Sequence, residues 1–427
     1  MSEQFSVKLQ KFLDDFDSQS DISVPDAVHQ RVATKDKVTT EEIPAEVIAR
    51  NVEFLTQHGF NNSDALWLSS KAFHSHICNV LLSSCSDDND DEVGSMVETF
   101  QSGEKFIQSS TLNRLAVNEL VSFCQTYFKD IVHAHSSIES VGQIPSYSVL
   151  SVRNRRRKME DRFCIVSDFC LLQIPEKQSL LNSGISLFAI FDGHGGPECA
   201  LYVSKHLAYN LCTSASFPSN LRESTLEAYE RTERNLLAKC HRENIKSGTT
   251  CLACVVDDES IHISWLGDSM VAMLNRFGEM KLLNHKHSPS NMDEWRLIKD
   301  NGGAIIEVQG ESRVNGWINV TRSFGDYHLK PPLLSLPQYV RFARCSSQSL
   351  LVMASDGFWD GMDICKCREL VISFYAERRD KGEDLADYLL NYSITEGGSS
   401  DNVTLIIVYL LEREELADSL RSVKISC

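Results

Sequence analysis

The first third of the chain carries apolar residues at helical spacing. The spacing recurs in four segments in which apolar positions fall three or four residues apart, namely 6–16, 44–59, 63–84 and 111–135. This period gathers the apolar side chains on one face of a helix. Gly59 ends the second segment and Ser63 begins the third, as is typical of a helix end and a helix start. The pattern predicts an all-α region over about the first 135 residues.

The pattern changes beyond a Ser-rich segment of low charge at 135–152, which we interpret as a junction. Short β-like runs follow, separated by turns of hairpin length, at 249–256, 261–267, 270–275 and 279–283. Strands joined so tightly must be antiparallel. Long amphipathic segments interrupt the strands and predict helices at 197–212, 220–243, 291–303, 365–378 and 380–392. The sequence predicts an α+β fold in which antiparallel sheets pack together and helices cover them.

Charge is distributed unevenly along the 427 residues. The formal net charge is −17, and the first 145 residues hold 22 acidic and only 10 basic side chains. This asymmetry indicates two units, and we predict domains over 1–145 and 146–415 with a C-terminal tail over 416–427. A chain this acidic would be repelled by nucleic acid and by anionic membranes, so we expect neither as a partner.

Cysteine usage bears on the compartment. The chain has 14 irregularly spaced cysteines, no apolar signal segment near its first residues, and no apolar run long enough to cross a bilayer. Irregular cysteines of this kind are typical of free thiols in a reducing environment. We therefore expect a cytoplasmic protein, with the nucleus as a further compartment.

Carboxylates stand at five predicted strand ends. Each one alone has an ordinary explanation, because Asp-Gly is a common turn and Asp caps backbone amides. Together they would repel one another unless a cation held them. Oxygen ligands without a matching Cys or His set favour Mg²⁺ or Mn²⁺, and a metal-assisted hydrolase is the expected product of such a site. The residues are Glu160 with Asp161, Asp192, Asp268, Asp356 and Asp401.

Seven ordered segments carry a family resemblance: "RRKMED", "FAIFDGHGG", "SGTT", "WLGDS", "VTRSFGD", "MASDGFWD" and "SSDNVT". In this order they resemble the metal-dependent Ser/Thr protein phosphatases of the type 2C class, over roughly 150–412. The wording "ESRVNGWINVTRSFGD" is similar to the calmodulin-dependent-kinase phosphatase branch, which includes a nematode sex-determination phosphatase and places a helical domain before the catalytic one. The resemblance implies two antiparallel sheets packed as a β-sandwich flanked by helices (αββα), after an N-terminal all-α domain.

The resemblance also implies a mechanism and a set of site residues. Two Mg²⁺ or Mn²⁺ ions share a bridging water that attacks phosphoserine or phosphothreonine directly, with no phosphoenzyme. Arg156 binds the phosphate, and His194 donates a proton to the leaving oxygen. The implied metal ligands are Asp192 as the bridge, Gly193 through its carbonyl, Asp356 and Asp401 on one ion, Glu160 on the other with Asp161 acting through waters, and Asp268 on a weaker third ion.

Alternatives stay open at several of these positions. The basic run "RNRRRK" at 153–158 also fits a nuclear-targeting patch or a solvated face. His194 could instead orient a metal-bound water, and Asp268 could be an ordinary hairpin-turn aspartate. For the whole chain, the alternative to an enzyme acting on phosphoproteins is a pseudophosphatase scaffold that works through its helical domain. In either case residues 1–145 could recruit a protein partner, as an adaptor or regulatory domain.

Overall fold

The chain divides into two compact units. The computed structural model describes residues 2–17, 36–83, 97–99, 105–136, 144–175, 177, 184–377, 384–421 and 423. Unit 1 comprises Met1–Val141 and Asp168–Gly184, and unit 2 comprises Gly142–Ser167 and Ile185–Cys427. Unit 1 therefore takes in a short segment from far along the sequence. Among the described residues, no helix is both long and apolar enough to cross a membrane.

Unit 1 is mainly helical, as the apolar spacing predicts. Its helices are α1 (Ser2–Asp17), α2 (Ile43–Gln57), α3 (Asn62–Ala72), a π-helical turn (Phe73–Ile77), α4 (Cys78–Ser83), α5 (Ser109–Thr126) and α6 (Phe128–Ser136). The expected helix over 63–84 is thus interrupted by the π turn, and the one over 111–135 is broken at Tyr127. A three-stranded sheet, which the sequence pattern did not predict, joins β1 (Lys37–Thr39), β3 (Lys105–Gln108) and β2 (Val97–Thr99).

The second segment of unit 1 is an insertion between two strands of unit 2. It forms a 3-10 helix, η4 (Phe169–Leu172), which packs against α3. Asp168 caps this turn, since its Oδ1 atom accepts a hydrogen bond of 2.9 Å from the Cys170 amide. Phe169, Leu171 and Leu172 are all buried. Apolar contact thus ties the insertion to the helices of unit 1.

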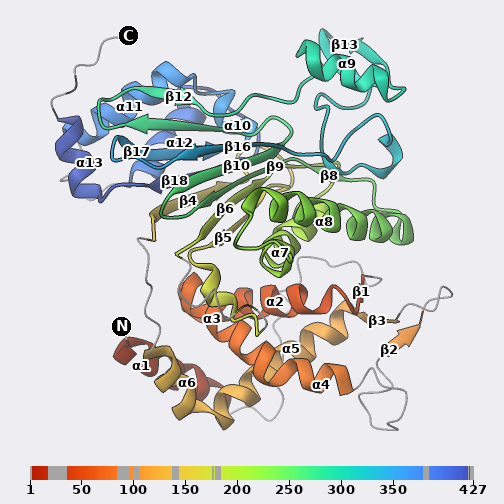
Figure 1. Ribbon diagram of the computed structural model, residues 1–427, viewed down its shortest axis with the longest axis vertical. Helices are drawn as coiled ribbons and strands as arrows, with labels where there is room; N and C mark the ends of the chain where they lie inside the picture. Colours follow the sequence, from red (N-terminus) through yellow and green to blue (C-terminus); the bar gives the residue numbers. More distant parts are fainter. Residues whose placement is uncertain are drawn as a thin grey trace. The chain divides into compact units, whose positions relative to one another are not determined.

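Unit 2 is built on two five-stranded antiparallel sheets (Figure 1). The first has the order β16-β10-β9-β6-β5, with β5 (Arg162–Val166), β6 (Ser186–Phe191), β9 (Cys251–Val256), β10 (Ser260–Leu266) and β16 (Gln338–Ala343). The second has the order β12-β11-β17-β18-β4, with β4 (Ser146–Val152), β11 (Met270–Asn275), β12 (Met280–Leu282), β17 (Gln348–Ala354) and β18 (Val403–Tyr409). The hairpins expected at 249–283 are confirmed as consecutive strands, of which β9–β10 and β11–β12 pair directly.

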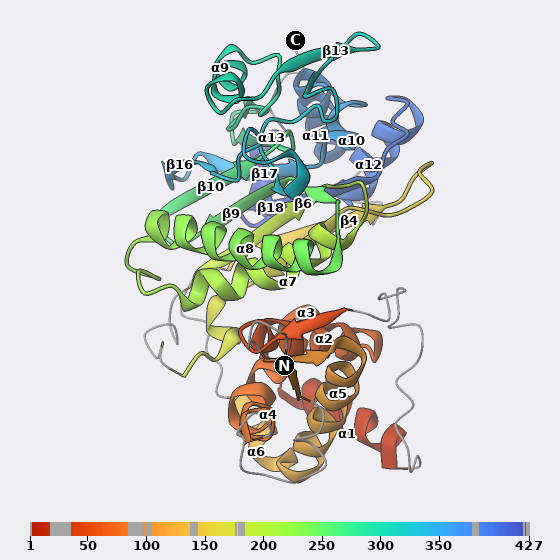
Figure 2. The ribbon, with the colours of Figure 1, turned by 90° about the vertical axis from the view of Figure 1, so that its right-hand side faces the viewer.

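The two sheets pack face to face and helices cover both outer faces. Side chains such as Phe188, Ile263 and Met353 fill the core between the sheets. Helices α7 (Glu198–Thr213) and α8 (Leu221–Glu243) cover the first sheet, whereas α11 (Ile364–Glu377), α12 (Leu385–Thr395) and α13 (Arg413–Leu420) cover the second, as Figures 1 and 2 show. The expected αββα sandwich after a helical N-terminal region is therefore confirmed.

Smaller elements surround one end of the sandwich. Helix α9 (Met292–Asp300) and the hairpin β13 (Ile305–Val308) to β14 (Glu311–Val314) share a small core of their own. Short strands β7 (Gly193–His194), β8 (Gly248–Thr249) and β15 (Phe324–Gly325) form a separate three-stranded sheet. A one-turn helix, α10 (Asp356–Trp359), follows β17 directly. Three of the candidate site residues lie in these short elements, namely Gly193, His194 and Asp356.

Candidate active site

The predicted carboxylates gather because their strands end at one edge of the sandwich. Asp192 follows β6 and Glu160 with Asp161 precedes β5, while Asp356 follows β17 and Asp401 precedes β18. Strands β5 and β6 pair antiparallel, and so do β17 and β18. In an antiparallel pair, the end of one strand lies beside the start of its neighbour. Carboxylates that are up to 241 positions apart in sequence are therefore brought to the same edge.

Three of these carboxylates form a compact cluster. Each of Asp192, Asp268 and Asp356 offers an oxygen, and the three oxygens all lie within 4.8 Å of one another. Burial, together with the negative charge of neighbouring carboxylates, raises the pKa of Asp192 well above its ordinary value and that of Asp268 to about 7. Such shifts mean that positive groups such as Lys286 offset the negative charge only in part. An oxygen-only cluster under this repulsion fits a hard divalent cation.

Asp161 is buried and is held in place by two hydroxyl groups. Its Oδ2 atom accepts hydrogen bonds from Thr404 Oγ1 at 2.8 Å and from Ser355 Oγ at 3.0 Å. Burial raises the pKa of Asp161 to about 6 although both hydroxyl groups act to lower it. The carboxylate is thus oriented by two neighbours of the strand-end aspartates, since Ser355 precedes Asp356 and Thr404 lies in β18.

Gly193 lies close against the backbone of Glu160, the residue that precedes Asp161. A Cβ atom at this position would lie only 2.5 Å from the carbonyl oxygen of Glu160. Any larger residue would push apart the two segments that carry Glu160 and Asp192. The glycine therefore allows the start of β5 and the end of β6 to approach one another.

Arg156 is paired with Asp401, which is not one of the three clustered carboxylates. One of its Nη atoms is hydrogen-bonded to Asp401 Oδ2, and the Arg156 side chain is 60% exposed. The neighbouring Asn402 fixes the Asp401 loop, because its backbone amide donates to Asp401 Oδ1 at 2.7 Å. Its Oδ1 atom also accepts from the Glu160 amide at 2.8 Å. The guanidinium group is thus exposed at the rim of the acidic site.

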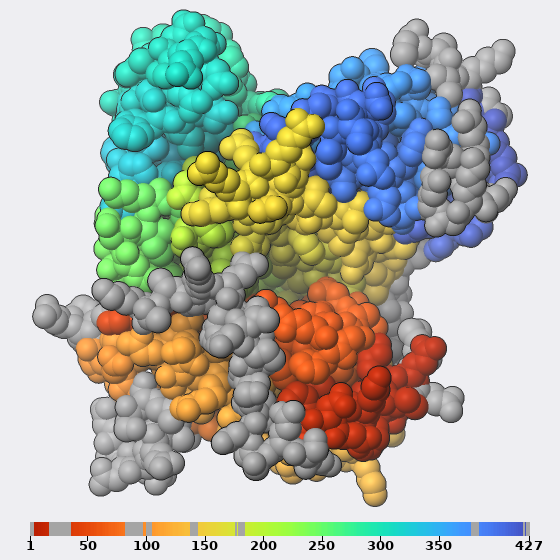
Figure 3. Space-filling view, turned by 180° about the vertical axis from the view of Figure 1, so that it is seen from behind, coloured from red at the N-terminus to blue at the C-terminus, as the bar shows by residue number. Residues whose placement is uncertain are grey.

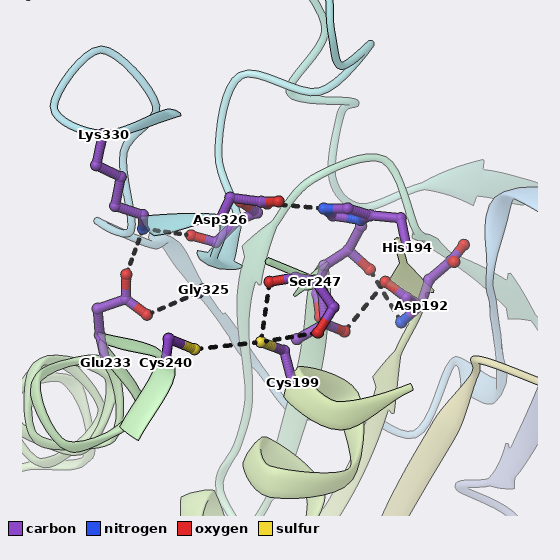
Figure 4. Close-up of polar contacts among 12 residues, drawn as sticks. Asp192, His194, Cys199, Glu233, Cys240, Ser247, Gly325, Asp326 and Lys330 are labelled. Carbon is purple, nitrogen blue, oxygen red and sulfur yellow. Dashed lines mark hydrogen bonds and ion pairs between the residues drawn. The ribbon is translucent and has the colours of Figure 1, made fainter. Parts of the chain in front are cut away.

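His194 is paired with Asp326, the last residue of the segment "VTRSFGD". The His194 Nε2 atom lies 2.7 Å from Asp326 Oδ2, which also accepts a hydrogen bond of 2.6 Å from Ser323 Oγ (Figure 4). Burial alone would lower the pKa of His194, but the charge and hydrogen bond of Asp326 outweigh it and raise the pKa. A Cβ atom at Gly248 would collide with both partners, so only glycine leaves room for the pair.

The loop that carries Asp326 is anchored on α8. Glu233 Oε2 in α8 accepts a hydrogen bond of 3.0 Å from the Gly325 amide, and Lys330 is paired with the same carboxylate. The Asp326 amide donates to the Ser247 carbonyl oxygen at 3.0 Å. Three separate contacts therefore hold the carboxylate that faces His194.

The structure brings the predicted residues to one site but adds partners that the sequence did not reveal. Asp326, Ser355 and Thr404 were missed as individual site residues. Their signal was present, because all three stand inside the quoted segments "VTRSFGD", "MASDGFWD" and "SSDNVT". Their partners, however, can be recognised only once the strands are paired.

Comparisons with known proteins agree with this geometry. A family model described as "Protein phosphatase 2C" matches residues 146–403. Mouse "Protein phosphatase 1E" is 32% identical over 305 residues, which is 71% of this chain and 39% of that protein. Human "Protein phosphatase 1F" is 32% identical over 271 residues, 64% of this chain and 58% of that protein. The chain thus matches between about two fifths and three fifths of the length of these relatives.

A solved structure shares the fold of nearly the whole chain. It is described as the "Structure of a C.elegans sex determining protein", with a TM-score of 0.70 and 22% sequence identity, and the match covers 90% of this chain and 91% of that one. At this identity the likeness concerns the fold alone. The family model, in contrast, spans more than half of the chain and contains every clustered carboxylate. The chain belongs to the protein phosphatase 2C family.

Proposed function

We propose that this chain is a metal-dependent protein phosphatase that hydrolyses phosphoserine and phosphothreonine in protein substrates. The observation that carries the proposal is the convergence of Asp192, Asp268 and Asp356 within 4.8 Å. The raised pKa values of Asp192 and Asp268 mean that the cluster binds either protons or cations, and family membership favours cations. The names of the relatives, all protein phosphatases, support the same reaction class.

Mg²⁺ or Mn²⁺ suits the donor set, because every donor is an oxygen atom. We assign two ions to the site and a weaker third ion beside Asp268. When bound, these ions would supply an activated water that attacks phosphorus directly, without a phosphoenzyme, and would neutralise charge on the phosphoryl group. The residues that would hold them are Asp192, the Gly193 carbonyl, Glu160, Asp356 and Asp401, with Asp161 acting through waters.

Arg156 and His194 supply the remaining chemistry from the chain itself. The exposed guanidinium of Arg156 presents a planar fork that suits two oxygens of a phosphate group. The imidazole of His194, with its raised pKa, keeps a proton that the leaving seryl or threonyl oxygen needs. The hydrogen bond between Asp326 Oδ2 and His194 Nε2 holds this ring in place. Binding of the phosphate and protonation of the leaving group thus fall to two separate side chains.

The test is turnover of a phosphothreonine peptide and of p-nitrophenyl phosphate by the metal-free protein with and without Mn²⁺. We expect activity only with added metal and its loss on chelation. Asp356→Asn should lower kcat by several orders of magnitude, with weaker Mn²⁺ binding by calorimetry. A metal-free protein that hydrolyses the peptide at the full rate would contradict the proposal.

We further propose that residues 1–145 form an adaptor or regulatory domain for a protein partner, 146–415 the catalytic domain, and 416–427 a tail that begins within α13. The acidic excess of the first region supports a basic or neutral partner. A deletion that tests this must also replace residues 168–184, because the segment belongs to unit 1 and its side chains Phe169, Leu171 and Leu172 are buried. We expect the deleted protein to keep its kcat/KM for a short phosphopeptide and to lose affinity for whole phosphoproteins. Equal affinity would refute the adaptor role.

Phosphoproteins are the proposed substrates, and neither nucleic acid nor an anionic membrane is proposed as a partner. The net charge of −17 supports this choice, since both surfaces are negatively charged. The cysteines that the structure describes are free thiols, which supports a reducing compartment such as the cytoplasm. Cell fractionation with an antibody against the chain would test the compartment.

A further inference from the structure

A dense positive charge stands beside the acidic site. The segment Arg153–Lys158, which we call the basic loop, directly follows β4 and contains five basic residues out of six. All five basic side chains are exposed, in a chain whose net charge is −17. The connection leaves the sheet beyond β4 as a yellow loop in Figure 2, and the yellow segment is visible on the surface in Figure 3. Only Arg156 has been given a role so far.

The backbone of the basic loop is fixed at both ends by one residue of the site. Asn402 Nδ2 donates to the carbonyl oxygens of Arg153 and Lys158, each at 2.9 Å. Asn154, at a left-handed φ of 51°, donates from Nδ2 to the Ser399 carbonyl oxygen at 2.8 Å. The loop is therefore a preorganised part of the site and differs from a free basic tail.

Of the five basic side chains of this loop, only Arg156 has an ion pair within the described part of the chain, and Arg153 donates a hydrogen bond to the Arg157 carbonyl oxygen. Arg156 is paired with Asp401, whereas Arg155, Arg157 and Lys158 form no ion pair with any residue that the structure describes. Exposed arginines elsewhere in unit 2 do have carboxylate partners, for example Arg296 with Asp293 and Arg421 with Asp418. Local charge of one sign at the rim of a site attracts ligands of the opposite sign.

The spacing fits a peptide. Consecutive Cα atoms lie about 3.8 Å apart, and an extended peptide advances about 3.3 Å per residue. If Arg156 holds the phosphate to be removed, the charges next to it lie within reach of side chains one to three residues along the substrate. We propose that Arg155, Arg157 and Lys158 bind acidic groups, carboxylates or a second phosphate, that flank the phosphoserine or phosphothreonine. This inference rests on the proposed phosphatase function and specifies its substrate class.

Nuclear targeting is the other use of such a run. A targeting signal is read as an extended basic segment, whereas here the hydrogen bonds of Asn402 and Asn154 hold the backbone in a closed loop. The position beside the carboxylate cluster also serves no purpose for import. These two observations favour the substrate-binding role.

The test compares three phosphothreonine peptides of one sequence, with neutral flanks, with glutamate flanks, and with a non-hydrolysable phosphonate in place of the flanking acid. Full-length wild-type protein in Mn²⁺ should show a kcat/KM for either acidic peptide that is roughly 3- to 30-fold above the neutral one, carried by KM and reduced by salt. In the triple variant Arg155→Ala/Arg157→Ala/Lys158→Ala, the ratio should fall to about 1. A higher ratio for only one of the two peptides identifies which acidic group is bound.

Matched variants distinguish the effect of positive charge in the basic loop from the effect of positive charge elsewhere on the surface of unit 2. Lys281→Ala removes an exposed charge from β12, the edge strand opposite β4, and should leave the ratio unchanged. Lysine substitutions at Arg155 and Arg157 should keep most of the ratio of kcat/KM between the acidic and the neutral peptides. A wild-type ratio of 1, or an unchanged ratio in the triple variant, overturns the inference. If the triple variant changes only the fraction of the protein found in the nucleus, the basic run is assigned to targeting instead. If the wild type hydrolyses none of the peptides, the proposed function itself fails.

Discussion

His194 and Asp326 form a hydrogen-bonded pair, with 2.7 Å between Nε2 and Oδ2, in which the histidine side chain is 31% exposed and the aspartate only 3%. The carboxylate is almost completely shielded from solvent, so its charge acts mainly on the ring. Its effect is to favour the doubly protonated imidazole, which retains a proton on the second nitrogen. Asp326 is thus a positioning residue that acts through His194.

Asp326→Asn should therefore impair the protonation of the leaving group. We expect kcat for a phosphothreonine peptide to fall by about 10- to 100-fold, because its alkoxide leaving group needs a proton. Turnover of p-nitrophenyl phosphate, whose phenolate leaves easily, should fall much less. Asp257→Asn is a matched control, since Asp257 Oδ2 lies 3.2 Å from His262 Nε2 in a second Asp–His pair outside the site. Equal losses for both substrates would contradict the role of Asp326.

Arg156→Ala should chiefly weaken phosphate binding. A charge-assisted hydrogen bond is worth about 1.5–3 kcal/mol, so the inhibition constant for inorganic phosphate should rise by roughly 10- to 100-fold. Arg156→Lys should recover only part of the loss, because an ammonium group lacks the planar fork. Product-inhibition kinetics give the inhibition constant for inorganic phosphate in the wild type and in both variants. Wild-type affinity in the alanine variant would remove Arg156 from the site.

The metal-free protein should lose stability as the pH rises. The pKa of Asp268 is about 7 in the folded protein, against an ordinary value of 3.8. Between these values the folded state binds more protons than the unfolded state, so the stability falls as the pH rises through this window. We expect a Tm at pH 8 at least about 2–4 °C below that at pH 5.5, and recovery at pH 8 when Mn²⁺ is added.

The Asp268→Asn variant isolates this contribution. Without the ionisable group, the metal-free variant should show a smaller decrease in Tm between pH 5.5 and pH 8 than the wild type. Differential scanning fluorimetry measures both proteins in the same buffers. An identical pH dependence in the two proteins would show that the pKa of Asp268 is not raised in the folded protein.

The sequence predicted the sandwich well because its hairpins are short. Turns such as 257–259 leave no choice but antiparallel pairing, and the amphipathic helices between strands have clear 3.6-residue periods. The small sheet of unit 1 was missed because strands of three or four residues, such as β1 and β3, are too short to show alternation. The attachment of 168–184 to unit 1 was also missed, since it depends on contacts with α3, about 100 residues away.

The site was predicted at the level of carboxylates but not of their partners. Asp192 and Asp356 stand at strand ends, where an acidic residue is conspicuous against apolar neighbours. Ser, Thr and Asp in the flanking segments are too common to single out, and their meaning comes from pairings across 132 residues for His194–Asp326 and 243 for Asp161–Thr404. Such pairings follow from strand register, which the sequence pattern does not specify.

Phe169 should be essential for the packing of α3. Its side chain is fully buried in the 3-10 helix that contacts α3, in a segment that the chain inserts from between β5 and β6. Phe169→Ala leaves a cavity and should lower the free energy of unfolding of unit 1 by about 3–5 kcal/mol. Amide hydrogen exchange in α3 should accelerate accordingly. Phe277→Ala, which truncates a phenylalanine that is 67% exposed, is the matched control and should change nothing in α3. Unaltered protection of α3 in Phe169→Ala would mean that the insertion only lies on unit 1 and does not stabilise it.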